Sequence, residues 1–278
     1  TMPASNVTDT ANGAANTYTV KYNGNEATGG STTSSTHTYD TAKNLTSNGF
    51  TRSYTVTFKH NYGAVADTSK TATYTFSKWN TASNGTGTNY NDGVSVSSLS
   101  STNGATVNLY AQWNSSSVTY NPTRTGYTFG GWYENSGCTG TRVDSSGTYT
   151  PTANKTLYAK WTDNTYTVAY NGNGAAGGET ASSSHTYDTA KNFTTNGFTR
   201  SYTVTFKHNY GTVADTSKTA TYTFSKWNTN SEGTGTNYND GVSVSNLTST
   251  NNGTFNLYAQ WTSSSVTYTP TRTGYTFG

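Results

Sequence analysis

The chain has 278 residues, a length that fits one to three domains of ordinary size. It contains 62 Thr, 33 Ser, 32 Asn and 28 Gly, and only 10% of its residues are charged, against about 25% in an average soluble domain. This composition excludes a coiled coil and a highly charged tail. Aromatic residues make up 14% of the chain and argue against a disordered Ser/Thr-rich stalk, because disordered segments lack side chains that can bury surface. An all-β protein is the class that remains.

The predicted elements are short strands separated by turns. Apolar and polar residues alternate with a period of two, which is typical of half-buried strands. In chain order, the alternating apolar positions are Tyr18-Val20-Tyr22, Tyr54-Val56-Phe58 and Leu109-Ala111-Trp113. Turn sequences separate these runs at Asn23-Gly24, Asn61-Tyr62-Gly63, Asn91-Asp92-Gly93 and Asn103-Gly104. The best candidate for a helix is Tyr39–Leu45, which is at most two turns long.

The charge pattern, the hydrophobicity and the cysteine content argue against a nucleic-acid partner, a membrane span and an internal disulfide. The formal net charge is only +3, and the Lys and Arg residues are scattered singly, so no nucleic-acid partner is predicted. No apolar run approaches the roughly 18 residues of a membrane-spanning helix, so no membrane span is predicted in this segment. Cys138 is the only cysteine, which excludes a disulfide within the chain.

Internal repetition is the strongest signal in the sequence. Residues 17–113 align without a gap with residues 165–261, at an offset of 148, and 81 of the 97 positions are identical. The pattern predicts an N-terminal extension or linker at 1–16, repeat A1 at 17–113, repeat B1 at 114–161, repeat A2 with a short linker at 162–261, and a truncated repeat B2 at 262–278. Because B2 stops where B1 continues into Gly131-Trp132, we expect the chain to be part of a longer array.

The A and B repeats share two sequence blocks. Repeat A1 contains YTFSKW at Tyr74–Trp79 and closes with LYAQW at Leu109–Trp113. Repeat B1 contains YTFGGW at Tyr127–Trp132 and closes with LYAKW at Leu157–Trp161. Repeat A is therefore interpreted as an expanded form of repeat B, with extra strands ahead of the shared half.

These blocks carry a family resemblance. The run VTYNPTRTGYTFGGWY at Val118–Tyr133, together with TLYAKW at Thr156–Trp161, resembles the signature of the internalin B-repeat family, also called Listeria–Bacteroides repeats. Repeat A1 resembles the family more loosely, through its opening Tyr18–Asn25 and its last strand. It departs from the family at residues 50–73, where an extra hairpin is expected, and at Ser77-Lys78-Trp79, which replaces the usual Gly-Gly-Trp.

The resemblance implies small β-grasp-like modules in tandem on secreted or wall-attached bacterial proteins, acting mainly as stalks and as adhesive or interaction modules. We therefore expect a fold between all-β and β-grasp-like, that is α+β with little helix. We expect tandem small modules in an elongated array, and a location that is secreted or at the bacterial cell surface.

The sequence contains no constellation that predicts catalysis. The HExxH and GxSxG motifs and phosphate-binding glycine loops are missing. Each histidine lies in strand-like surroundings and is interpreted as an exposed hairpin residue; the four are His37, His60, His185 and His208. We predict no enzyme activity and no catalytic residue.

The acidic residues do not predict a cofactor or metal site either. Asp40, Asp67 and Asp92 fall in separate turns and are interpreted as turn residues that bond their own backbone. The segment Asn89–Gly93 has a single carboxylate, which is fewer than a calcium-binding loop supplies. We therefore predict no cofactor and no metal site.

A few side chains could form a covalent cross-link. Cys138 lies at an apparent loop tip without a neighbouring cation to lower its pKa, so an incidental small residue is the favoured interpretation. A thioester with Gln112 or Gln260 and an isopeptide bond from Lys43 to a nearby Asn are the alternatives. Intact-mass measurement would detect the loss of ammonia.

Exposed tyrosines are the candidate ligand contacts. Three point away from the buried side of their strands, and two lie at turns, so each could stack on a sugar ring or a partner protein. These residues are Tyr62, Tyr90, Tyr110, Tyr158 and Tyr258.

Two functional hypotheses follow. The first is a non-catalytic stalk or structural array whose partners are the neighbouring repeats, and in which an unpaired strand edge in the truncated B2 repeat could recruit other copies of the chain into fibres. The second is an adhesin that binds glycan or a host surface protein through its exposed tyrosines and the extra hairpin.

Overall fold

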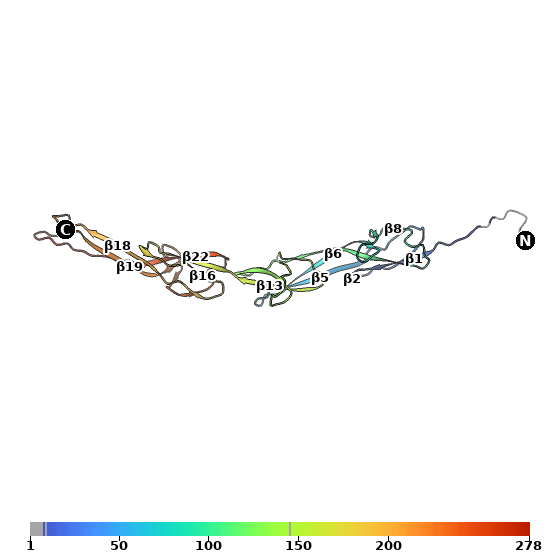
Figure 1. Ribbon diagram of the computed structural model, residues 1–278, viewed down its shortest axis with the longest axis horizontal. Coiled ribbons are helices and arrows are strands. Elements are labelled where there is room, and N and C mark those ends of the chain that lie inside the picture. Colours follow the sequence, from blue (N-terminus) through green and yellow to red (C-terminus); the bar gives the residue numbers. More distant parts are fainter. Residues whose placement is uncertain (1–7, 9, 145) are drawn as a thin grey trace, which may run out of the picture. The chain divides into compact units, whose positions relative to one another are not determined.

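Figure 1 shows the computed structural model, which describes residue 8 and residues 10–144 and 146–278. Part of the expected N-terminal extension at 1–16 lies outside the described residues. The chain divides into two compact units. Unit 1 comprises residues up to Pro122 together with Gly131–Lys160, and unit 2 comprises Thr123–Gly130 together with Trp161–Gly278. The repeat boundaries inferred from the sequence stay a prediction.

Unit 1 is built from strands of both the A1 and the B1 repeat segments. Its strands are β1 (Thr17–Asn23), β2 (Gly29–Gly30), β3 (Ser35–Thr38), β4 (Lys43–Asn44), β5 (Phe50–Lys59), β6 (Thr68–Asn80), β7 (Asn89–Tyr90), β8 (Ser95–Val96), β9 (Thr106–Asn114), β10 (Val118–Thr119) and β12 (Thr148–Tyr149). Strands β11 (Tyr127–Tyr133) and β13 (Lys155–Asp163) contribute residues to both units.

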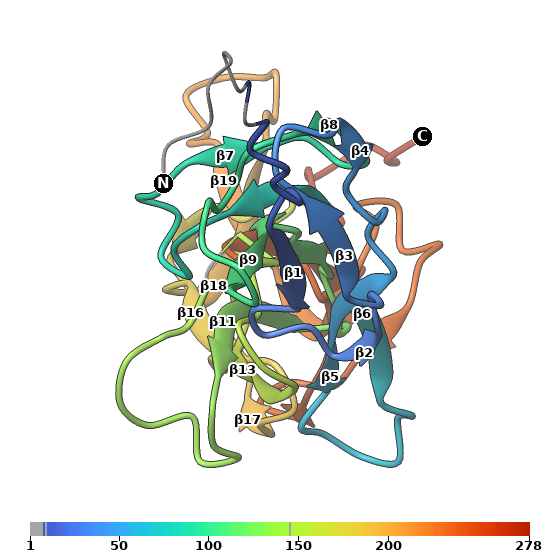
Figure 2. The ribbon, with the colours of Figure 1, turned by 90° about the vertical axis from the view of Figure 1, so that its right-hand side faces the viewer.

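The larger sheet of unit 1 has the order β11-β13-β5-β6-β9-β1-β3, with β2 beside β5 and β7 beside β6. Figure 2 shows β1 between β3, its antiparallel partner, and β9, its parallel partner. The hairpin expected at residues 50–73 is confirmed as the antiparallel pair β5–β6. Two small sheets, β4–β8 and β10–β12, complete the unit.

Unit 2 repeats the arrangement of β1–β9 in the second A repeat. Its strands are β14 (Thr165–Asn171), β15 (Gly177–Gly178), β16 (Ser183–Thr186), β17 (Lys191–Asn192), β18 (Phe198–Phe206), β19 (Thr216–Asn228), β20 (Asn237–Tyr238), β21 (Ser243–Val244) and β22 (Gly253–Thr262). They form a sheet of order β15-β18-β19-β22-β14-β16 with β20 beside β19, and a small sheet β17–β21.

The all-β prediction is confirmed. No helix is present among the described residues, so the short helix considered at Tyr39–Leu45 is wrong. Tyr39 and Asp40 form a turn in which Asp40 has a φ of 59°, and the chain then enters β4. Asp is one of the few residues other than Gly that adopt this left-handed conformation as single residues. A residue with this φ cannot continue a right-handed helix, so no helix forms here. Correspondingly, no helix of the described residues could cross a membrane. β-grasp-like modules stay a prediction.

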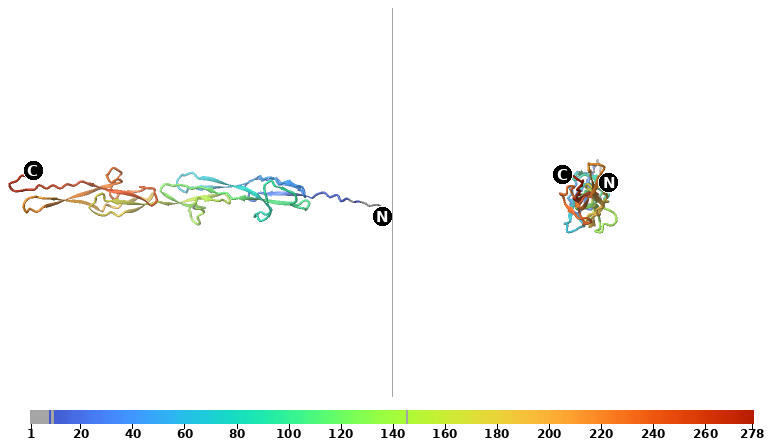
Figure 3. Two further views of the ribbon diagram at one scale, coloured as in Figure 1. Left: turned by 90° about the horizontal axis from the view of Figure 1, so that it is seen from above. Right: turned by 90° about the vertical axis from the view of Figure 1, so that its left-hand side faces the viewer.

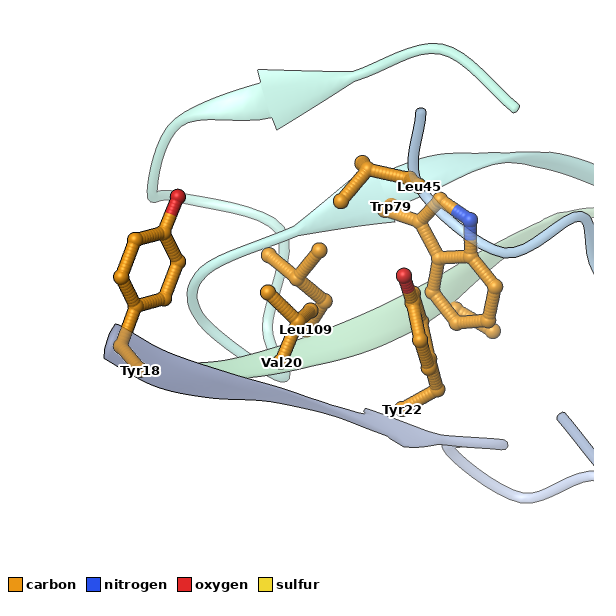
Figure 4. Close-up of a cluster of buried hydrophobic side chains, with 7 residues drawn as sticks. Tyr18, Val20, Tyr22, Leu45, Trp79 and Leu109 are labelled. Atoms are coloured by element: carbon orange, nitrogen blue, oxygen red, sulfur yellow. The ribbon is translucent and has the colours of Figure 1, made fainter. Parts of the chain in front are cut away.

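Each unit has a small aromatic core. In unit 1 the core surrounds Trp79, whose ring centroid lies 4.8 Å from that of Tyr22 and 5.0 Å from that of Phe76. Figure 4 shows this cluster, to which β1 contributes alternate side chains. The buried members are Tyr18, Val20, Tyr22, Leu45, Trp79, Leu109 and Ala111. The period-two prediction is therefore confirmed for β1 and β9.

A β-bulge allows Trp79 to enter this core. In a regular strand Phe76 and Trp79 would face opposite sides, because side chains alternate. The register of β6 against β9 shifts between Phe76 and Lys78, so one extra residue is accommodated and both aromatic rings reach the same side. The same shift occurs between Phe224 and Lys226 in β19.

The interpretation of the histidines as exposed residues is wrong, since three of the four are buried and His208 is half-buried. His37 is 1% exposed, because β3 places it beside Tyr18 on the core side of the sheet, with the two rings stacked 5.5 Å apart. Its Nε2 lies 2.9 Å from Ser35 Oγ, which in turn lies 3.2 Å from Tyr22 OH. His185 is equally buried in unit 2, and His60 is 7% exposed.

We expect these buried imidazoles to make stability depend on pH. Burial, and secondarily the charge of Lys43, lowers the pKa of His37; burial and Lys191 lower the pKa of His185. The unfolded chain therefore binds protons more readily than the folded chain, and stability is lost as the pH falls below about 6.5 toward the lowered pKa. Denaturant unfolding at pH 7.5 and pH 5 should show this loss. The loss should shrink in the double variant His37→Asn, His185→Asn, and an unchanged pH dependence in that variant would contradict the assignment.

Candidate functional site

Two of the five candidate tyrosines lie together in unit 1. Tyr62 lies in the loop between β5 and β6, and Tyr158 lies in β13. Both line a shallow depression of about 380 Å³, together with Val65 and the ion pair of Lys59 and Asp67. The parallel pairing of β13 with β5 brings them together, because it sets Tyr158 opposite Lys59.

The depression combines apolar and charged surface. Lys59 Nζ lies 2.6 Å from Asp67 Oδ2, and the hydrogen bond to this carboxylate, helped by its charge, raises the pKa of Lys59. Both groups are accessible to water, so the pair contributes little to stability. Val65 is 44% exposed beside them. A tyrosine face next to polar groups suits a sugar ring or an extended peptide.

The other three tyrosines do not join this site. Tyr90 packs against the core around Trp79. Tyr110 lies in β9 opposite Asn80, and Tyr258 occupies the matching position in β22; both are half-buried. All five tyrosines are half-buried, so the expectation that they are exposed is wrong. A ligand role for each of them stays a prediction, and the structure groups only Tyr62 with Tyr158.

The residues considered for cross-links make ordinary hydrogen bonds. The Gln112 amide donates to backbone carbonyls, including that of Ser83 at 3.3 Å, and Lys43 Nζ donates to Thr36 O at 2.8 Å. Cys138 Sγ lies 3.4 Å from Ala159 O, so the thiol is turned toward β13. These contacts favour the interpretation of Cys138 as a small packing residue.

We expect Cys138 to be a poor nucleophile. Burial raises the pKa of its thiol, and the hydrogen bond from Asn61 and the charge of Lys160 only oppose this effect. The thiolate is the reactive form, so alkylation near neutral pH should be slower than for an ordinary cysteine. The rate of iodoacetamide labelling, followed by mass spectrometry against pH, should have its midpoint above the ordinary thiol value. The same chain unfolded in guanidinium is the control, and an equal or lower midpoint in the folded chain would refute the prediction.

The aspartates of the predicted turns accept hydrogen bonds from residues in other loops. Asp92 Oδ1 accepts from Asn48 N and Asp40 Oδ1 accepts from Ser98 Oγ, both at 2.8 Å. Together with the ion pair of Asp67, these contacts show that the expectation of bonds within each residue's own turn is wrong. Among the residues that the structure describes, no group of three His, Cys, Asp or Glu side chains is placed to hold a metal ion.

A contact that sequence reasoning missed joins residues 123–130, part of repeat B1, to repeat A2 within unit 2. Tyr127 OH donates to Asp188 Oδ2 at 2.7 Å, and the Tyr127 ring centroid lies 6.0 Å from that of Tyr187. The bond raises the pKa of Tyr127, and together with a bond from Asn246 it lowers the pKa of Asp188.

The backbone takes part in the same contact. Asn164 N donates to Gly126 O at 2.8 Å, and Thr128 Oγ1 donates to Asn164 Oδ1 at 2.6 Å. Gly126 has a φ of +79°, and a Cβ added there would lie 2.1 Å from the Tyr187 ring. Only glycine fits this close approach. The sequence offered one signal for it, the glycine that precedes the aromatic block.

Repeat B1 also packs against repeat A1 within unit 1. Phe58 of β5 is fully buried against Trp132, with ring centroids 4.8 Å apart, and Leu157 of β13 lies opposite Phe58 in the register. Tyr74 OH donates to Pro151 O at 2.6 Å. Segments of B1 therefore share packing with both A repeats.

Residues 100–160 and 192–260 each match the model of the Listeria-Bacteroides repeat domain. These two segments match the Listeria–Bacteroides repeat family. The two matches end at the closing LYAxW blocks of B1 and A2, which confirms the resemblance for these segments. The opening of repeat A1 at Tyr18–Asn25 lies outside both matches, and its resemblance stays a prediction. This repeat family is typical of bacterial surface proteins and is generally non-catalytic. No curated protein and no solved structure matched the chain.

Proposed function

We propose that these Listeria–Bacteroides repeats form a structural array that spaces other parts of a bacterial surface or extracellular protein from its point of attachment. The observation that carries the proposal is the sharing of B1 between the two compact units. Residues 131–160 of B1 pack with A1, and residues 123–130 pack with A2. Small repeats that share burial with their neighbours stabilise one another, as the stacked repeats of a solenoid do.

A display experiment tests the spacer role. The array is placed between a cell-surface anchor and a fluorescent reporter, with one or more copies of the 148-residue A–B cycle. The distance of the reporter from a membrane dye should grow in proportion to the number of cycles. The control is a Gly/Ser linker of equal length, whose span grows only with about the square root of its length. The proposal fails if the array and the flexible linker give the same dependence.

A second candidate function is ligand binding by the Tyr62–Tyr158 depression. The observation that favours it is the convergence of these two tyrosines with exposed Val65 and the Lys59–Asp67 pair. A glycan or host surface protein is the proposed ligand class. Glycan and protein arrays should show binding that the double variant Tyr62→Ala, Tyr158→Ala abolishes. The matched control is Tyr110→Ala, which removes a half-buried tyrosine outside the depression. Equal binding by both variants would contradict this role.

A further inference from the structure

The two A repeats carry the same arginine beside different partners. Arg52 lies in β5, and Arg200 lies at the matching position of β18, within the shared sequence FTRSYTVTF. Both strands pair with the next strand of their hairpin in the same antiparallel register. In each repeat the guanidinium lies over two tyrosine rings, and its Nε is buried without a hydrogen-bond partner among the described residues. The surroundings of the two side chains can therefore be compared position by position.

In repeat A1 a glutamate neutralises the arginine. Arg52 Nη2 donates to Glu26 Oε2 at 2.5 Å. Glu26 holds this place with a φ of 68°, a left-handed conformation that disfavours most residues other than glycine. The side chain of Glu26 is 70% exposed, although strand β13 of repeat B1 pairs with the same strand β5. The place of this carboxylate is therefore open to solvent in a unit whose B segment is in position.

In repeat A2 the carboxylate is missing. The residue at the position of Glu26 is Gly174, which has a φ of +83°. A Cβ added to Gly174 would lie 3.3 Å from Arg200 Cζ, so the guanidinium lies directly beside the point from which a side chain would reach it. Figure 3 shows this part of unit 2, with β15 in yellow beside the β18–β19 hairpin in orange. Among the described residues, the hydrogen bond of Arg200 is a long one, 3.5 Å from Nη1 to Asn173 O.

Other acidic side chains of unit 2 do not replace this carboxylate. Among the described residues, Arg200 forms no ion pair. Glu179 and Glu232 are exposed, and Glu232 follows Ser231, whose carbonyl accepts from Asn173 Nδ2 at 2.7 Å. The aspartates bind elsewhere: Asp188 accepts from Tyr127, Asp215 pairs with Lys207, and Asp240 accepts from Asn196.

The difference between the repeats comes from the A segments themselves. In unit 1, where repeat B1 is in position, the partner of Arg52 is supplied by A1 and none of its hydrogen bonds goes to B1. A B-type segment therefore does not provide the anion that this arginine binds. Replacing Glu26 by Gly174 is sufficient to leave the guanidinium of A2 without a carboxylate.

We propose that Arg200 and Gly174 form a binding site for the carboxylate of an acidic side chain on a partner protein. That side chain would take the place that Glu26 occupies beside Arg52. A planar guanidinium can donate two parallel hydrogen bonds to one carboxylate, which makes arginine well suited to this ligand. Stacking over Tyr202 and Tyr222 orients the guanidinium before the ligand arrives. The site goes beyond the proposed spacer function, because it gives repeat A2 a partner of its own.

Repeat A1 favours a protein ligand over an acidic sugar. The carboxylate beside Arg52 belongs to a glutamate, so the geometry around this arginine fits an acidic side chain. In A2 the missing side chain of Gly174 leaves room for one from another chain to approach from the exposed side. We therefore expect a segment rich in Glu or Asp to bind, with an affinity that falls as salt is added, because both charges are accessible to water.

Peptide binding to the full chain tests the site. The probe is a short peptide of alternating Gly and Glu, and the control is the same peptide with Gln in place of Glu. Titration is followed by NMR of the arginine Nε–Hε signals, which report Arg52 and Arg200 separately. We expect the Glu peptide to shift the Arg200 signal in a saturable way and to leave the Arg52 signal in place. The Gln peptide should shift neither.

Reciprocal variants make the test independent of folding defects. Gly174→Glu supplies the carboxylate within A2 and should weaken binding by about tenfold or more. Glu26→Gly removes it from A1 and should create a second site, so that the Arg52 signal now shifts as well. Each variant places in one repeat the residue that the other repeat already carries. Glu232→Gln should leave the affinity unchanged.

Four results would overturn the proposal. They are the absence of a shift at Arg200, equal shifts with the Glu and Gln peptides, unchanged binding by Gly174→Glu, and a gain in affinity in Glu232→Gln, which would mean that Glu232 already occupies the site. Binding of glucuronate without binding of the Glu peptide would assign the site to an acidic sugar and overturn it too. Because the readout is binding in solution, it can fail while the display experiment succeeds.

Discussion

The variant Trp79→Ala should lower the free energy of unfolding of unit 1 by about 3–5 kcal/mol. Trp79 is 0% exposed, and rings of Tyr22, Phe50 and Phe76 surround it. Removing the indole leaves a cavity that these rings cannot fill, since the sheet fixes their backbones. Because the core of unit 1 has few buried side chains, this loss is a large part of its stability. Hydrogen exchange of β1 and β9 amides measures it locally.

The second repeat supplies the matched control for this variant. Trp227 has the same neighbours as Trp79, with ring centroids 4.9 Å from Tyr170 and 5.0 Å from Phe224. Trp227→Ala should therefore destabilise β14 and β22 by a similar amount. A loss below about 1 kcal/mol in either repeat would show that the tryptophan is not the centre of the core.

The variant Gly126→Val should detach residues 123–130 from repeat A2. Valine is strained at a φ of +79°, which costs about 1–2 kcal/mol, and its Cβ would collide with the Tyr187 ring. Displacing that ring adds about 1–3 kcal/mol and disturbs the neighbouring bond between Tyr127 and Asp188. Calorimetric unfolding should show unit 2 melting at a lower temperature.

Gly274 provides a control for the backbone strain alone. It occupies the same place in an identical octapeptide, Thr271–Gly278 against Thr123–Gly130, with a φ of +80°. No atom lies within 4 Å of the position that a Cβ would take there. Gly274→Val should therefore have a much smaller effect on unit 2. Equal effects of the two variants would mean that the packing against Tyr187 is unimportant.

The strands within each repeat could be predicted from the sequence because their signal is local. The alternation Tyr18-Val20-Tyr22 is buried as expected, and the extra hairpin at 50–73 forms. The burial of His37 could not be predicted from its polarity, which suggested an exposed residue. It lies on the buried parity of β3, where stacking on Tyr18 and a bond to Ser35 compensate for burial.

Buried polar residues were the hardest to predict. Asn80 follows Trp79 and is 0% exposed. Its Nδ2 donates to Gly85 O, Gly87 O and Asn89 Oδ1, while its Oδ1 accepts from the backbone of Ala82 and Gly87. The residue folds the following loop back onto β6. Because the chain contains many Asn residues, the sequence does not indicate that Asn80 in particular is buried and holds this loop.

Pairings between repeats could not be predicted either. The parallel pair of β5 and β13 joins Val56 to Lys155, and no local pattern specifies a partner so distant in sequence. The same holds for the Tyr62–Tyr158 depression, which exists only because of that pairing. Sequence reasoning selected both tyrosines one by one, without a reason to place them together.

Successive repeats share folded units, and hydrogen exchange tests this sharing most directly. In the Trp227→Ala variant the core of unit 2 is weakened at a site within repeat A2, away from residues 123–130 in the sequence. If B1 and A2 share a folded unit, amides of 123–130 should exchange faster together with those of β14 and β22. Faster exchange confined to β14 and β22, with residues 123–130 unchanged, would contradict the claim.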